Sequence, residues 1–136
     1  MHKEIYLAPF EKLLGMNIES LDNGKCVLSM AYKVELSQSA GLLHGGAIAS
    51  LADTAVATAM KTLFPPSVRF GTVELKMSYL KPVKNGVITA YASVIKINDH
   101  TYNGIVDVTD KNGEAVAKAE TLFKVSKKDL ANLKKS

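Results

Sequence analysis

Hydrophobic residues follow a helical spacing in one long stretch of this sequence and come close to alternating in most of the remainder. Between Gly45 and about Leu63 the apolar positions recur at i, i+3 and i+4 in an alanine-rich segment, which predicts one long helix. Pro65-Pro66 ends this helix, because proline disfavours helical geometry in the residue before it and has no backbone donor.

The near-alternating stretches predict strands that are separated by turns. These predicted strands cover residues 25–34, 68–80, 87–97, 102–109 and 114–125. Residues 3–15 have a partly helical spacing, which predicts a short leading helix that breaks at Gly15. One central helix followed by an antiparallel meander predicts an α+β domain whose sheet wraps the helix. This order argues against a doubly wound nucleotide-binding fold.

Length and composition indicate a single domain over residues 1–136, with 47% hydrophobic and 22% charged residues and no linker-like stretch. Cys26 is the only cysteine and lies in an apolar stretch, so no intramolecular disulfide is expected. The first ten residues do not resemble a signal peptide, and no stretch predicts a membrane span. We therefore expect a cytoplasmic protein without a membrane partner.

The net charge of +4 comes mostly from a basic C-terminal tail, residues 127–136, where four lysines stand against Asp129. That tail contributes +3, so the remainder of the chain carries +1. Arg69 is the only arginine, and no basic stripe is interleaved with aromatic residues, so nucleic acid is not an expected partner.

Asp53 is the only charged residue between Leu36 and Met60, and it lies within the predicted alanine-rich helix. A surface helix normally presents a charged face, so this helix is expected to be buried or covered by a partner. A carboxylate that is partly desolvated in such a place is suited to act as a base or nucleophile. The alternative is an aspartate that caps or pairs locally.

His44-Gly45-Gly46 stands where the predicted helix begins. Glycine allows a ligand to approach the first backbone amides, which no helical carbonyl satisfies. Together with the helix dipole, these amides could stabilise the oxyanion that develops when a carbonyl is attacked. The tripeptide is also compatible with a plain glycine-rich helix entry.

Other catalytic chemistries lack their residues. His2, His44 and His100 are far apart in the sequence and Cys26 has no companion at metal-ligand spacing, so no metal site is expected. Neither a Gly-x-Ser-x-Gly motif nor a catalytic cysteine context is present. Asp53 is the remaining candidate.

The run Gly41-Leu42-Leu43-His44-Gly45-Gly46, followed nine residues after the histidine by Asp53, closely resembles the PaaI-type hotdog-fold acyl-CoA thioesterases. Tyr79-Leu80-Lys81-Pro82 and Thr121-Leu122-Phe123 are also similar, so the resemblance covers most of the chain. It implies a hotdog fold, in which an antiparallel sheet of five to six strands wraps one long central helix. It further implies a homodimer, a dimer of dimers as homotetramer, and a site between subunits.

In that family the amide at Gly45 polarises the thioester carbonyl, while Asp53 of the neighbouring protomer attacks it or activates water. His44 shapes the helix entry, and no cofactor is required beyond the CoA of the substrate. Gln38, six residues before His44, stands where acyl-CoA hydrolases of this group carry Asn or Gln. Thr72 stands where relatives carry a water-orienting hydroxyl.

Substrate binding is assigned to Gly46 and Tyr79, which belong to the matching motifs, and to Lys81, Lys84 and Lys96, which could attract the CoA phosphates. The resemblance thus implies hydrolysis of an acyl-CoA to a free acid and CoA.

Two alternatives are kept: a non-catalytic acyl-CoA binding or sensing module, and a hotdog hydratase or dehydratase. The retained Asp53 argues against the first, and a missing proline-rich histidine signature argues against the second.

Overall fold

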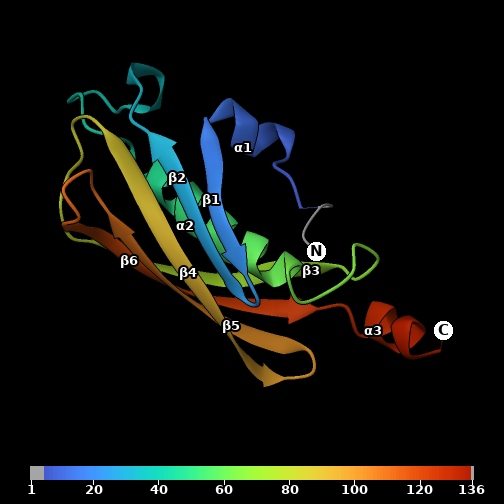
Figure 1. Ribbon diagram of the computed structural model, residues 1–136. Coiled ribbons are helices and arrows are strands. Elements are labelled where there is room, and N and C mark those ends of the chain that lie inside the picture. Colours follow the sequence, from blue (N-terminus) through green and yellow to red (C-terminus); the bar gives the residue numbers. More distant parts are fainter. Residues whose placement is uncertain (1–4, 136) are drawn as a thin grey trace.

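The central helix α2 (Gly45–Lys61) lies against the concave face of a six-stranded antiparallel sheet, which curves around it (Figure 1). The computed structural model describes residues 5–135. The strands are β1 (Met16–Asp22), β2 (Lys25–Ala31), β3 (Phe70–Tyr79), β4 (Val87–Asn98), β5 (Thr101–Thr109) and β6 (Ala115–Val125). Their order across the sheet is β1-β2-β4-β5-β6-β3, so β1 and β3 form its two edges.

Within residues 5–135 there are also three short helical segments: α1 (Pro9–Leu13), the 3-10 turn Val34–Leu36, and α3 (Lys127–Lys134). Helix α1 precedes β1, and α3 follows β6 near the end of the chain (Figure 1). The predicted α+β architecture with one long helix and up to six strands is confirmed.

The core lies between α2 and the inner face of the sheet. Helix α2 contacts every strand, and its fully buried side chains include Leu51 and Val56. A glycine on the sheet allows a close approach of the helix: a Cβ on Gly104 of β5 would stand 2.4 Å from Val56 Cγ1 of α2. Each fully buried Leu, Ile or Val side chain contributes about 1.5–3 kcal/mol relative to exposure, so this packing fixes the position of α2 on the sheet.

Several elements differ from the sequence predictions. Strand β1 was not predicted, the leading helix is confined to Pro9–Leu13, and part of the basic tail forms α3. Strand β2 ends at Ala31 rather than Val34, and Val34 is instead the first residue of the 3-10 turn. Residues 3 and 4 of the predicted leading helix, and Ser136 of the tail, lie outside the described residues.

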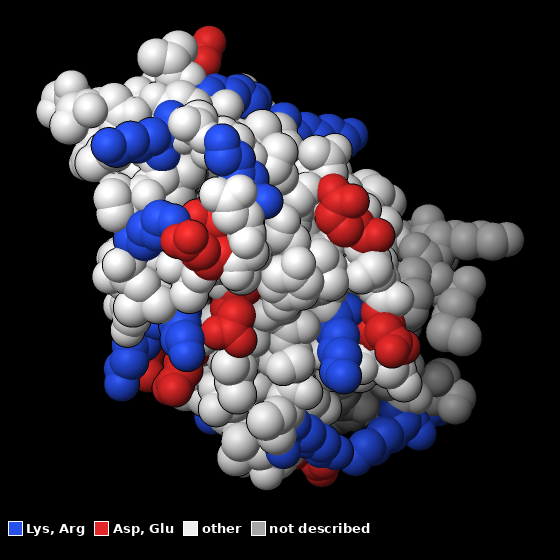
Figure 2. Space-filling view, turned by 60° about the vertical axis from the view of Figure 1, so that its left-hand side comes forward, with Lys and Arg blue, Asp and Glu red and all other residues white. Residues whose placement is uncertain are grey.

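Cys26 of β2 is buried, and burial raises the pKa of its thiol to about 12. Within residues 5–135, no helix is both long and apolar enough to cross a membrane. Lysines and arginine form several small groups with acidic residues between them on the face that Figure 2 shows. The charges on that face are therefore mixed.

Candidate active site

The first turn of α2 leaves one backbone donor open. His44 is the N-cap, and its Nδ1 accepts a hydrogen bond from the Gly46 N–H at 2.7 Å. The Ala47 and Ile48 N–H groups donate to the His44 carbonyl oxygen at 2.9 and 3.3 Å. Among the residues that the structure describes, the Gly45 N–H is then the first-turn amide without an acceptor. It stands at the positive end of the helix dipole.

His44 acts as a cap in this arrangement. An Nδ1 atom that accepts a hydrogen bond carries no proton, so the ring is held with its proton on Nε2 when neutral. A Cβ on residue 46 would lie 2.9 Å from His44 Nδ1, so glycine at this position leaves room for the capping imidazole.

Tyr79, at the end of β3, holds the other side of Gly45. Its hydroxyl donates to the Gly45 carbonyl oxygen at 2.8 Å, and a Cβ on Gly45 would stand 3.3 Å from Tyr79 Cζ. Sequence analysis assigned Tyr79 to substrate binding and missed this positioning contact. This contact arises because the end of β3 lies beside the start of α2, and no local sequence pattern indicates that proximity.

Asp53 is half-buried on α2 and accepts a hydrogen bond from the Thr72 hydroxyl of β3 at 2.8 Å, between Thr72 Oγ1 and Asp53 Oδ1. This bond orients one carboxylate oxygen, and within residues 5–135 the other oxygen has no hydrogen-bond partner. No Lys or Arg pairs with Asp53 within residues 5–135. The carboxylate is thus held in place by a neutral group.

The candidate residues fall into two clusters. Gln38, Gly45, Tyr79 and Lys81 line one open groove of about 370 Å³ beside the start of α2. Asp53 and Thr72 form the second cluster, eight residues further along the helix, which corresponds to about 12 Å along its axis. The structure of one chain therefore separates the free amide from the carboxylate.

The three candidate lysines have different surroundings. Lys81 Nζ pairs with Asp110 at 2.8 Å and also with Glu114, and this pairing holds the pKa of Asp110 down at about 2. Lys96 pairs with Asp99 at 3.1 Å. In the pairing of β4 with β5 it stands opposite Tyr102, whose ring packs against Phe64 just after α2. Lys96 therefore lies at the end of the sheet where α2 terminates. Lys84 lines a hollow that also contains Lys81 and Asp110.

Metal ligation finds no support in the described part of the chain, where no group of three His, Cys, Asp or Glu side chains could hold an ion. His2 lies outside that part. The chemistry that the two clusters offer is a backbone donor for an oxyanion and an oriented carboxylate, and both suit attack on a carbonyl.

Comparison with solved structures defines the class of fold. The PaaI protein of the phenylacetic acid degradation operon of Escherichia coli superposes with a TM-score of 0.80 at 25% identity, over 86% of this chain and 83% of that one. The chain thus has the hotdog fold, as the resemblance implied.

Sequence comparison gives the family. Residues 40–117 match the family described as Thioesterase superfamily. A putative esterase of Saccharolobus solfataricus is 34% identical over 107 residues, which are 78% of this chain and 70% of that protein. A 1,4-dihydroxy-2-naphthoyl-CoA hydrolase of Listeria monocytogenes is 29% identical over 87% of this chain and 96% of its own length. The chain belongs to the thioesterase superfamily, and the prediction of a thioester hydrolase is confirmed.

Proposed function

We propose that the chain hydrolyses acyl-CoA thioesters in a homodimer, with the Gly45 amide of one protomer and Asp53 of the other at each site. The observation that carries this proposal is the free Gly45 N–H, about 12 Å along the helix from the Asp53 carboxylate of the same chain. Both groups need to lie about 3 Å from the same reacting carbonyl. A second chain can meet that requirement.

Strand β3 supplies a surface on which a second copy can bind. It is an edge strand of ten residues, and its exposed apolar side chains include Val73 at 59% exposure. An exposed edge strand of this length is a template for pairing with another strand. A dimer of this kind has a two-fold axis, and each protomer uses the same surface.

The arrangement of β3 beside α2 favours a shared site. Thr72 near the start of β3 contacts Asp53, whereas Tyr79 at its end contacts Gly45. Antiparallel pairing of β3 with its copy places the Thr72 end of one strand beside the Tyr79 end of the other. The carboxylate cluster of one protomer then faces the free amide of its partner.

In this site the amide at Gly45 stabilises the negative charge that develops on the thioester oxygen, and one such donor is worth about 10²–10³ in rate. Asp53 either removes a proton from the attacking water or attacks the carbonyl itself and forms an anhydride that water cleaves. In both routes CoA leaves as the thiol and the acyl group as the free acid. Thr72 orients the carboxylate, and Gln38 lies in the groove where it can orient water or the acyl group.

Two findings support CoA as the leaving group. The relative from Listeria monocytogenes is named as a hydrolase of a CoA thioester. Lys81 and Lys84 lie beside the Gly45 groove, although Lys81 is neutralised by two carboxylates. We therefore assign Lys84, rather than Lys81 or Lys96, as the first lysine to test for contact with the CoA phosphates. The proposed reaction needs no metal or redox cofactor.

Free-thiol release from a panel of acyl-CoAs tests this function. Asp53→Asn is expected to lower kcat by at least about 10²-fold, the scale of a catalytic acid or base. Asp107→Asn is the matched control, because it removes the same charge from an exposed position on β5. Equal activity of Asp53→Asn and wild type, at matched oligomeric state, would contradict the proposal. Binding of acyl-CoAs without hydrolysis would favour the sensing module.

A further inference from the structure

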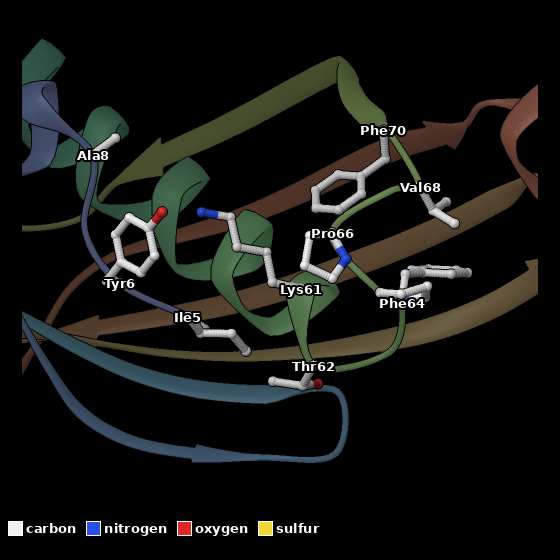
Figure 3. Close-up of a pocket in the computed structure, with 10 residues that line it drawn as sticks. Ile5, Tyr6, Ala8, Lys61, Thr62, Phe64, Pro66, Val68 and Phe70 are labelled. Atoms are coloured by element: carbon white, nitrogen blue, oxygen red, sulfur yellow. The ribbon is translucent and has the colours of Figure 1, made fainter. Parts of the chain in front are cut away.

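A cavity of about 500 Å³ lies at the C-terminal end of α2, away from the Gly45 groove. Three parts of the chain enclose it: the segment before α1 with Ile5 and Ala8, the last turn of α2, and the loop from Phe64 into β3 (Figure 3). Its volume lies within the range of about 300–1,000 Å³ that is usual for small-molecule sites. None of the residues that sequence analysis assigned to the site lines it.

More of the wall of this cavity is apolar than polar. Phe64, Val68 and Phe70 contribute to it, while the polar side chains of Lys61 and Tyr6 are exposed at its rim (Figure 3). The hydroxyl of Thr62, which also lines the cavity, is already occupied: it accepts from the Gly24 N–H and donates to the Ala59 carbonyl oxygen, both at 2.7 Å. Such a wall favours an alkyl chain, because a polar ligand would lose its hydration without gaining partners.

The wall is also held in place by the core. The Phe64 ring packs edge-on against Tyr102 with 5.4 Å between centroids, and the Phe70 ring lies 5.9 Å from that of Phe123. Phe123 is fully buried and Tyr102 is nearly so. These contacts fix the two phenylalanines, whereas Tyr6 on another part of the wall is exposed.

The cavity lies in line with the carboxylate cluster. Phe70 precedes Thr72 by two residues on β3, so both side chains point to the same face of the sheet. On α2, Asp53, Ala57 and Lys61 are spaced by four residues and share one side of the helix. The eight residues from Asp53 to Lys61 span about 12 Å. A chain that starts at a carbonyl beside Asp53 can thus follow the helix past the small Ala57 side chain.

We infer that this cavity receives the end of an aliphatic acyl chain of more than about ten carbon atoms, because about 12 Å separate Asp53 from Lys61 at the cavity rim and an extended alkyl chain advances roughly 1.25 Å per C–C bond. The inference rests on the proposed function and narrows its substrate class to acyl-CoAs with long aliphatic chains. The CoA part leaves toward the partner's groove, and the alkyl part follows α2 in the chain that supplies Asp53.

Binding of S-alkyl-CoA thioethers tests the cavity separately from catalysis, because these compounds have no thioester carbonyl to hydrolyse. Calorimetric titration of the wild-type protein with butyl, hexyl, octyl, decyl and hexadecyl thioethers gives the dependence on length. Each buried methylene is expected to improve Kd by about fourfold. The improvement should continue past about ten carbon atoms, where the alkyl chain enters the cavity, and stop when the cavity is filled.

Two variants should shift this length dependence in opposite directions. Ala8→Trp fills the cavity and should weaken hexadecyl binding by at least about tenfold while leaving butyl binding unchanged. Phe70→Leu enlarges the cavity and should move the limit to longer chains. Ala115→Trp is the control, because it adds the same side chain at an exposed position on β6 outside the cavity. If Ala8→Trp does not fold, the length dependence of binding to Phe70→Leu tests the inference.

Affinities that do not depend on chain length, or that neither cavity variant changes, would overturn the inference. Hydrolysis of the matching acyl-CoAs is measured in parallel. Hydrolysis with flat alkyl affinity would leave the proposed function intact and reject the cavity. Length-dependent binding without any hydrolysis would support the cavity and contradict the proposed function.

Discussion

Replacing Gly45 by proline removes the backbone N–H that the proposed mechanism directs at the thioester carbonyl. Position 45 is the first residue of α2, where proline is well tolerated because the missing N–H has no partner within the helix. His44 already has the extended conformation, with ψ at 134°, that a residue before proline requires. The substitution therefore deletes one donor with little change to the backbone.

The expected loss has two parts that can be separated. A Cβ at position 45 would stand 3.3 Å from Tyr79 Cζ, so any side chain there displaces the ring by a few tenths of an ångström. Gly45→Ala also adds a Cβ beside Tyr79 but keeps the N–H. The ratio of kcat between Gly45→Ala and Gly45→Pro then isolates the donor, and we expect about 10²–10³.

Steady-state hydrolysis of an acyl-CoA, followed by thiol release, measures both variants. Urea unfolding and sedimentation establish that fold and oligomeric state match the wild type. If Gly45→Pro keeps a kcat similar to that of Gly45→Ala, the amide at Gly45 does not stabilise the transition state, and the assignment of the oxyanion site is refuted.

Three other substitutions test separate contacts. Thr72→Val removes the hydroxyl bonded to Asp53 and should lower kcat about tenfold to hundredfold, whereas Thr72→Ser should retain activity; equal rates would exclude an orienting role. Gly104→Ala forces a Cβ against α2 and should lower the free energy of unfolding by about 1–3 kcal/mol in urea titrations; an unchanged midpoint would contradict the packing. Arg69 holds the pKa of Asp129 down at about 2, below the ordinary value of 3.8. The pair therefore stabilises the fold at pH values above 3.8, and this stabilisation is lost as the pH falls toward 2. The stability difference between wild type and Asp129→Asn should therefore shrink over that window, and a constant difference would reject the linkage.

The sequence predicted the elements whose signals are local. Helix α2 has a continuous apolar spacing and ends before Pro65-Pro66, and the observed Gly45–Lys61 is close to the predicted range. Strand β1 was missed because a bulge between Ile18 and Ser20 shifts the register. Met16 and Ile18 fit an alternating pattern, but the next inward residue is Leu21, so the period of two is broken.

Helix α3 was missed because tertiary contacts hold it. Its sequence is mostly polar, and the Ser126 side chain caps it by accepting from the Asp129 N–H at 3.1 Å. Asp129 also accepts from the Arg69 backbone and side chain, both at 2.9 Å, across sixty positions of sequence. No local pattern contains that contact.

The candidate site divides in the same way. His44, Gly45 and Asp53 lie on one helix and its cap, so their spacing could be read from the sequence. The contacts of Thr72 and Tyr79 with that helix depend on the pairing of β3 with β6, which sequence patterns did not fix. The cavity at the end of α2 combines residues from three separate segments and had no signal in the sequence.

Subunit mixing tests the shared site most directly. Asp53→Asn and Gly45→Pro protomers are each expected to be nearly inactive as homodimers. In a mixed dimer, one site receives Asp53 from the Gly45→Pro chain and the Gly45 amide from the Asp53→Asn chain, while the other site receives both defects. Equal mixing with free exchange should restore about a quarter of wild-type activity, since half of the dimers are mixed and each has one intact site. No restoration, with exchange verified, would contradict a site built from two chains.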